Sequence, residues 1–192
     1  MSHALRIEPL GEQHDRAAFS CGIEPLDRYL KTQAGQAVEK KLAAVFVLTE
    51  DGKTILGYFT LSSYVIQLDD IPDSLAKKLT KMRQVPATLL GRLARSFHTK
   101  GKGFGEILLA DALKKALVNS ETVASWAMVV DAKDQKAAEF YKRYGFAEFP
   151  TIPGRLFLPM NSIRELFERP SEPLASAASQ IAGDPRPAEP SR

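Results

Sequence analysis

The sequence has a single cysteine and no long hydrophobic run. Because Cys21 is alone among 192 residues, no internal disulfide can form, as expected of a protein from a reducing compartment. No stretch of about 18 apolar residues is present, and the N-terminus lacks the pattern of a signal peptide. We therefore expect a soluble, cytoplasmic protein that does not enter a membrane. No metal site is predicted.

Acidic residues are missing from one long stretch of the chain. Between residues 74 and 105 there is no Asp or Glu, although the formal net charge of the whole chain is only +3. Such a basic stretch is either a solvated face or a surface for phosphate-rich RNA. Because few aromatic side chains alternate with these charges, any RNA contact should be mainly to its backbone. The candidates for that contact are Lys77, Lys78, Lys81, Arg83 and Arg92.

Proline is unevenly distributed and marks the end of the folded part. Five of the 12 prolines lie between residues 170 and 192, separated mainly by alanine, serine and glutamate. This segment has too little apolar surface to offset the entropy of ordering it. We expect one folded domain over residues 1–165 and a disordered tail over residues 166–192.

Hydrophobic periodicity predicts alternating strands and helices along the domain. The predicted strands are Leu5–Leu10, Ala43–Thr49, Ile55–Ser63, Ala87–Ala94, Ala124–Val130 and an antiparallel pair over Phe146–Phe149 and Leu156–Met160. The predicted helices run from Pro25 to about Lys41, then over Ile71–Met82, Glu106–Leu117 and Gln135–Tyr144.

A glycine-rich turn joins the fourth predicted strand to a helix. Gly101, Gly103 and Gly105 occupy alternate positions, flanked by Lys100 and Lys102. Glycines allow the backbone to approach a bulky anion closely, and the free amides of a helix N-terminus favour phosphate. The turn is therefore a candidate pyrophosphate site. It lacks the Lys-Ser or Lys-Thr of a P-loop and the glycine spacing of a dinucleotide fingerprint.

The segment Lys100–Gly105 instead resembles the Gln/Arg-x-x-Gly-x-Gly/Ala loop of the GCN5-related N-acetyltransferase (GNAT) family, with Lys100 in the first position. A second GNAT signature, Ala-x-x-Phe-Tyr-x-x-x-Gly-Phe, matches Ala137–Phe146. The resemblance implies an α/β (α+β) GNAT fold, a mixed central sheet of about six to seven strands with a splayed cofactor cleft. It also implies acetyl-CoA as co-substrate, bound by Leu93, Ala94, Arg95, Lys100, Gly101, Lys102, Gly103, Phe104, Gly105 and Asp134.

The same resemblance implies a catalytic role for Tyr141. In this family the tyrosine of the second signature protonates the departing CoA thiolate, although Tyr141 could instead be an ordinary core aromatic. No general base is evident. A lysine side chain has a pKa of about 10.4 and needs a base, whereas an α-amino group near 7.7–8.0 is largely neutral in cells. The missing base therefore favours an α-amine substrate.

Three further segments, Cys21–Leu30, Leu56–Leu61 and Pro86–Ala94, resemble the acetyltransferase toxins of bacterial toxin–antitoxin modules. That resemblance implies acetylation of the α-amine of aminoacyl-tRNA, a block of translation, and neutralisation by a ribbon-helix-helix antitoxin. A homodimer is a further expectation. Two alternatives stay open at this point. One is acetylation of a small-molecule or protein amine, and the other is an inactive acyl-CoA-binding module, in which Arg95 and Lys100 are remnants of lost function.

Overall fold

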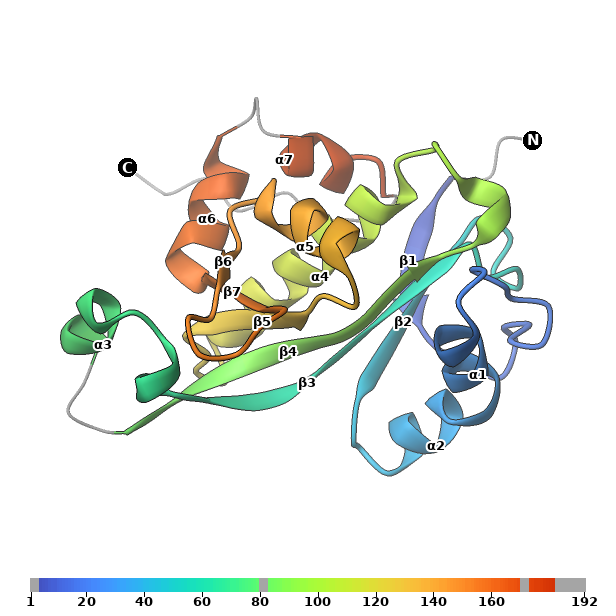
Figure 1. The fold of residues 1–192 in the computed structure, drawn as a ribbon. Helices are drawn as coiled ribbons and strands as arrows, with labels where there is room; N and C mark the ends of the chain where they lie inside the picture. The colour runs from blue at the N-terminus through green and yellow to red at the C-terminus, as the bar shows by residue number, and fades with distance from the viewer. Residues whose placement is uncertain (1–3, 80–82, 170–172, 182–192) are drawn as a thin grey trace.

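The computed structural model describes residues 4–79, 83–169 and 173–181 of the chain. Within them lies a seven-stranded sheet with the order β1-β2-β3-β4-β5-β7-β6 (Figure 1). All neighbouring strands are antiparallel except β4 and β5, which are parallel. The strands are β1 (Arg6–Pro9), β2 (Ala44–Thr49), β3 (Gly57–Gln67), β4 (Gln84–Arg95), β5 (Ala127–Asp131), β6 (Ala147–Glu148) and β7 (Arg155–Pro159).

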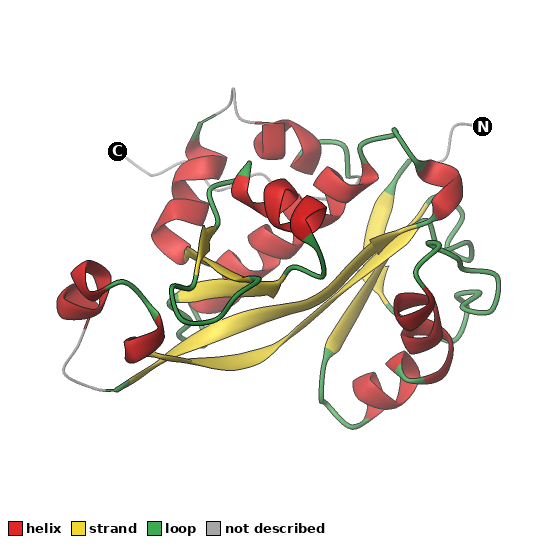
Figure 2. Ribbon diagram, in the orientation of Figure 1, coloured by secondary structure: helices red, strands yellow, loops and turns green. Residues whose placement is uncertain are grey.

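Helices cover both faces of this sheet (Figure 2). The α-helices are α1 (Glu24–Thr32), α2 (Ala34–Glu39), α3 (Asp73–Leu79), α4 (Phe104–Ser120), α5 (Gln135–Lys142), α6 (Met160–Glu168) and α7 (Pro173–Ala178), with 3-10 turns η1 (Leu68–Asp70) and η2 (Phe97–Thr99). Helices α4 to α7 gather on one face, α1 and α2 lie on the other, and α3 sits at the far end of the β3–β4 hairpin (Figure 1). This architecture confirms the predicted fold class.

The long helix α4 forms the centre of the larger core. Its buried side chains occur on every side of the helix rather than along one stripe, as expected of a helix enclosed by protein. The sheet covers one side of α4, and α6 and α7 pack against it as well. A glycine permits the close approach to the sheet, because a Cβ added at Gly57 would lie 2.7 Å from Cδ1 of Leu108.

Strand β4 is the axis of the sheet. It pairs with β3 from Gln84 to Arg95, but with β5 only from Ala87 to Leu90. The β3–β4 ladder contains a β-bulge, because Leu61 pairs with Leu90 and Thr60 with Arg92, leaving Gly91 without a partner. Bulges of this kind bend a strand and increase its twist. The bulge lies where the parallel ladder ends, because β5 ends at Asp131 while β4 continues to Arg95.

Several predicted boundaries differ from the structure. Strand β3 extends to Gln67 and β4 begins at Gln84, so both are longer than expected. The helix expected over residues 71–82 is shorter: η1 ends at Asp70, α3 begins at Asp73, and residues 80–82 lie outside the described ranges. The strand expected from Ala124 begins at Ala127 instead. The residues before it connect α4 to β5, and Thr122, Val123 and Ala124 are exposed there, so apolar composition alone did not place the start of the strand.

The predicted disordered tail is wrong for the residues that the structure describes. Helix α6 continues to Glu168, and residues 173–181 contain α7. Leu174, Ala177 and Ala178 are buried in the core cluster around α4, so a few small apolar side chains suffice where a large helix is available as a partner. Residues 170–172 and 182–192 lie outside the described ranges. Within the residues that the structure describes, no helix is both long and apolar enough to cross a membrane.

Candidate active site

The site begins where β4 extends past β5. The parallel ladder ends at the pair Leu90 and Val130, but β4 continues for five residues, from Gly91 to Arg95. Within the described structure no strand lies beside this edge, so its backbone groups are available to a ligand. Leu93, Ala94 and Arg95, predicted as cofactor-binding, all lie in this extension.

The glycine loop follows directly and leads into α4. Gly101 and Gly103 have φ angles of +81° and +73°, in the left-handed region that favours glycine. Gly103 is the N-cap of α4 and has no side chain to accept a hydrogen bond from the first turn. The first-turn amides of Phe104, Gly105 and Glu106 therefore have no capping side chain, and the positive end of the helix dipole points the same way.

Space lies in front of this loop. A Cβ added at Gly101 or Gly103 would meet nothing within 4 Å, and one at Gly105 would meet only the ring of Phe140 at 3.9 Å. The side chains of Lys100 and Lys102 are exposed at the rim. Free amides, a helix dipole, open space and two cations together suit a pyrophosphate group.

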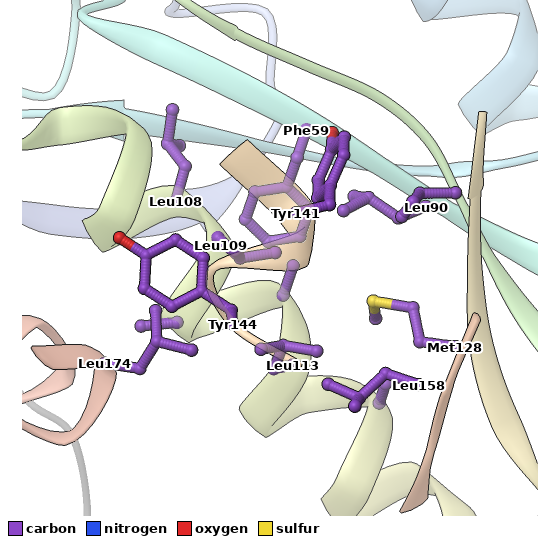
Figure 3. Close-up of a cluster of buried hydrophobic side chains, with 14 of the residues drawn as sticks. Phe59, Leu90, Leu108, Leu109, Leu113, Met128, Tyr141, Tyr144, Leu158 and Leu174 are labelled. Carbon is purple, nitrogen blue, oxygen red and sulfur yellow. The ribbon is translucent and has the colours of Figure 1, made fainter. Parts of the chain in front are cut away.

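Tyr141 lies on α5 beside this opening. It is 8 % exposed, and its ring packs edge-on against Phe140 and Phe146. Figure 3 shows it close to Phe59 and Leu108, at the centre of the core cluster. Burial raises the pKa of Tyr141 to about 12, so the hydroxyl keeps its proton at neutral pH and can donate it.

A second tyrosine, Tyr144, lies on the same side of the core but points elsewhere. Figure 3 shows its hydroxyl directed away from that of Tyr141, toward the side of Leu174. Burial raises the pKa of Tyr144, and the nearby Glu106 carboxylate raises it further. The role of Tyr141 in proton transfer stays a prediction.

Asp134 has the structural role that the sequence predicts. Its carboxylate accepts a hydrogen bond of 2.8 Å from the amide of Ala137 and caps α5. That hydrogen bond, with the nearby Lys133, lowers the pKa of Asp134. Its inclusion among the cofactor-binding residues stays a prediction.

The structure does not bring the predicted RNA contacts together. Lys77 and Lys78 are exposed on α3 and Arg83 is exposed just before β4, while Arg92 lies at the other end of that strand. Lys81 lies outside the described residues. Acidic side chains that the sequence argument did not count also lie close to the α3 lysines, because η1 and the start of α3 contribute Asp69, Asp70 and Asp73.

Arg92 has an aromatic support that sequence reasoning missed. Its guanidinium carbon lies 3.6 Å from the centre of the Tyr29 ring, on the face of the sheet covered by α1. Tyr29 is 5 % exposed, and its hydroxyl is buried with no hydrogen-bond partner in the described structure. The helical spacing of Tyr29 predicted a core position, but nothing local in the sequence linked it to a residue 63 positions later.

A polar cluster near the end of β5 was also missed. Arg155 donates two hydrogen bonds, of 2.7 and 3.0 Å, to the carboxylate of Asp131, and a third to the hydroxyl of Tyr64. Asp131 is thus held in a two-point ion pair. These three residues come from β7, β5 and β3, so only the folded sheet brings them together.

Comparison with known proteins places this geometry in context. No protein-family model matches the chain. A protein named probable toxin TacT, from Sinorhizobium fredii, is 31 % identical over 169 residues, with 83 % of this chain and 93 % of that protein covered. A tRNA-acetylating toxin from Mycobacterium tuberculosis is 30 % identical over 157 residues and covers 82 % of this chain and 93 % of its own length.

Solved structures give the same result in three dimensions. The toxin AtaT in complex with acetyl-methionyl-tRNAfMet superposes with a TM-score of 0.79 at 31 % identity, covering 85 % of this chain and 99 % of that one. A Tyr-to-Phe variant of AtaT, bound to acetyl-CoA and the C-terminus of the antitoxin AtaR, has a TM-score of 0.73 at 28 % identity, covering 86 % of this chain and 99 % of that one.

Proposed function

This chain belongs to the GNAT acetyltransferase toxins of bacterial toxin–antitoxin modules, and we propose that it transfers the acetyl group of acetyl-CoA to the α-amino group of an aminoacyl-tRNA. The observation that carries the proposal is the extension of β4 past the end of its ladder with β5, directly before the glycine loop. One continuous segment, from Gly91 to Gly105, thereby offers an open strand edge and a free helix N-terminus to one extended ligand.

The predicted cofactor-binding residues would contact different parts of acetyl-CoA. The amides of residues 103–105 would hold the pyrophosphate, with Lys100 and Lys102 adding charge at the rim. The open edge of β4 at Leu93–Arg95 would bind the pantetheine arm and offer an N–H group to the thioester oxygen as it becomes negative. Holding thioester and amine in one cleft supplies much of the acceleration by proximity.

In the proposed reaction Tyr141 is the general acid. When the amine attacks the thioester carbon, the C–S bond breaks and the sulfur leaves as a thiolate. The Tyr141 hydroxyl, with its pKa raised to about 12 by burial, is still protonated and donates its proton to that sulfur. The nitrogen loses one proton as the amide forms, and a proton from solvent restores the Tyr141 hydroxyl, so the protons balance. An α-amine near 7.7–8.0 is largely neutral at cellular pH, so attack needs no strong base.

The wider setting follows from the relatives. We infer that an antitoxin binds the protein, as AtaR binds AtaT, and that the antitoxin carries a ribbon-helix-helix DNA-binding domain. Acetylation of aminoacyl-tRNA would block translation, and we infer a cytoplasmic protein because the proposed substrate is found in the cytoplasm. A homodimer stays a prediction.

The test uses purified protein, acetyl-CoA and total aminoacyl-tRNA. After nuclease digestion, mass spectrometry should find N-acetyl-aminoacyl-adenosine for one or a few amino acids, and none with Tyr141→Phe. Parallel reactions contain polyamines or a lysine-rich peptide in place of tRNA. Acetylation of these amines with none of aminoacyl-tRNA would contradict the proposal and favour a small-molecule or protein acetyltransferase. Acetyl-CoA binding without acetylation of any amine would indicate an inactive acyl-CoA-binding module.

A further inference from the structure

Two half-buried arginines in this protein, Arg155 and Arg92, differ in their partners. Arg155, whose side chain is 24 % exposed, is neutralised by a two-point ion pair with Asp131. Arg92 is also only partly exposed, yet within the described residues its guanidinium has no hydrogen bond and no ion pair. The N–H donors of the Arg92 guanidinium are therefore available to an anion from outside the protein.

Aromatic packing fixes where the Arg92 guanidinium lies. It stacks on Tyr29 with 3.6 Å between the guanidinium carbon and the ring centre, and Tyr29 in turn stacks on Tyr58 at 6.4 Å between ring centres. The hydroxyl of Tyr58 donates to the carbonyl of Leu26 on α1, which anchors the stack. The stack leaves the edge of the guanidinium, where its five N–H donors lie, free of protein acceptors.

Tyr29 adds a second polar group with no partner. Its hydroxyl is buried and has no hydrogen bond in the described part of the chain. A purely structural ring here would be served better by phenylalanine, because an unsatisfied buried hydroxyl destabilises the fold. An anion that draws Arg92 away from the ring would uncover this hydroxyl, which could then donate to the same anion.

The position of Arg92 indicates whether it would bind a phosphate of the cofactor or of the acceptor. It lies within Gly91–Arg95, the part of β4 that extends past β5, but on the α1 face of the sheet, whereas the glycine loop leads into α4 on the opposite face. A phosphate on the α1 side therefore belongs to the acceptor and not to the cofactor. Among the predicted RNA contacts in the described residues, only Arg92 has this placement.

We propose that Arg92, supported by Tyr29, binds a backbone phosphate at the acceptor end of the tRNA and so positions the aminoacyl group at the open edge of β4. This inference rests on the proposed function for the identity of the acceptor. In the free protein the Tyr29 ring holds Arg92 at this position, so Tyr29 is a positioning residue. Once the phosphate has drawn Arg92 from the ring, the Tyr29 hydroxyl is a second donor to it.

The experiment measures tRNA binding and catalysis separately. Fluorescence anisotropy with labelled, deacylated total tRNA over a series of salt concentrations should show Arg92→Gln binding about tenfold more weakly. Its slope of log affinity against log salt should fall by about 0.7–0.9, the contribution of one phosphate contact. Steady-state acetylation should show a raised KM for aminoacyl-tRNA with kcat and the KM for acetyl-CoA nearly unchanged. Tyr29→Phe should weaken binding about threefold without changing the salt slope.

Arg164→Gln is the matched control, because it removes the same charge from α6 on the opposite face. Its affinity and salt slope should equal those of the native protein. Equal losses in the Arg92 and Arg164 variants would mean that only net charge matters, and would overturn the proposal, as would native tRNA binding by Arg92→Gln.

Arg92→Lys keeps the charge and the aliphatic stem but loses the planar fork, and it decides the matter if Arg92→Gln does not fold. An intermediate tRNA affinity is expected, and native affinity would overturn the proposal. Native binding by Tyr29→Phe would overturn the part assigned to the hydroxyl. Because binding is read without acetylation, a failure of the proposed reaction is distinguishable from a failure of this site.

Discussion

At the scale of single residues, burial gives Tyr141 two properties at once. The ring fills the core between α5 and the sheet, and the same exclusion of water keeps the hydroxyl protonated. A role in packing and a role in catalysis are thus compatible, and the sequence alone could not choose between them. They separate only when the hydroxyl is removed and the ring is kept.

Tyr141→Phe should fold and bind acetyl-CoA as the native protein does, because every ring contact remains. The leaving thiolate loses its proton donor, so kcat should fall by about 10²–10⁴. Calorimetry of acetyl-CoA binding and single-turnover acetylation of aminoacyl-tRNA would measure the two effects. A native rate would show that the hydroxyl is not the acid.

Gly105 offers a substitution that separates cofactor binding from folding. Unlike Gly103, it lies inside the first turn of α4 without a positive φ, and an added Cβ would make only an ordinary contact at 3.9 Å. Gly105→Ala should therefore leave the fold intact or stabilise it slightly, by about 0.5–1 kcal/mol. The methyl group would intrude on the amides, so the acetyl-CoA affinity should fall by roughly tenfold or more, equivalent to 1.4 kcal/mol.

Gly103→Ala would confound the two effects, because its φ of +73° costs an L-residue about 1–2 kcal/mol of folding free energy. Gly105→Glu should abolish acetyl-CoA binding, since its carboxylate would repel the pyrophosphate. Native affinity in Gly105→Glu would refute the assignment of this loop.

At the scale of elements, α4 explains why the chain continues past the second GNAT signature. A helix with apolar side chains on every side needs cover on its outer face, and α6 and α7 provide it. Proline-rich composition predicts a weak tendency of this segment to order by itself. Composition could not reveal that residues 173–178 pack on an apolar face of α4.

Leu174→Ala tests the packing of α7. Leu174 is 1 % exposed, and burial of this kind predicts a loss of about 2–5 kcal/mol in the free energy of unfolding. Leu42→Ala, at a leucine that is 68 % exposed, should change it by less than about 0.5 kcal/mol and serves as the control. Chemical denaturation of both variants gives the comparison, and equal stabilities would mean that α7 contributes nothing.

The elements also show what sequence could and could not predict. The strands, the glycine turn and α5 with its Asp134 cap were predictable because their signals are local, namely periodicity, capping residues and glycine spacing. The Arg92–Tyr29 stack and the Arg155–Asp131–Tyr64 cluster were not. Each joins residues from separate elements, and their contacts exist only once the sheet order is fixed.

At the scale of the whole molecule, buried tyrosines set the response to alkali. Burial is the largest cause of raised pKa values for Tyr29, Tyr58, Tyr141 and Tyr144. A raised folded-state pKa gives stability that is complete below the unfolded pKa of about 10 and is lost as the pH rises further. Each tyrosine that ionises first in the unfolded chain lowers the unfolding free energy by about 1.4 kcal/mol per pH unit.

We therefore expect a steep loss of stability between about pH 10 and pH 12. In Tyr141→Phe the unfolding free energy should fall less steeply with pH. The variant lacks the Tyr141 hydroxyl, whose pKa of about 12 in the folded protein contributes to the slope of the native protein. Urea unfolding at several pH values would measure the slopes. Identical slopes in both proteins would contradict a buried, protonated Tyr141.

The bulge at Gly91 has a consequence for how such a gene can change. The flanking pairs, Leu61 with Leu90 and Thr60 with Arg92, would survive the loss of the unpaired glycine between them. A strand without the bulge should bend and twist less, which would shift the open edge at Leu93–Arg95 relative to the glycine loop and disrupt the proposed acetyl-CoA site. Deletion of one codon would then turn a growth-arresting protein into a folded, inert one. Cells that survive forced expression while still producing full-length folded protein should include some in which this codon is deleted. Sequencing the gene in the survivors would identify these deletions.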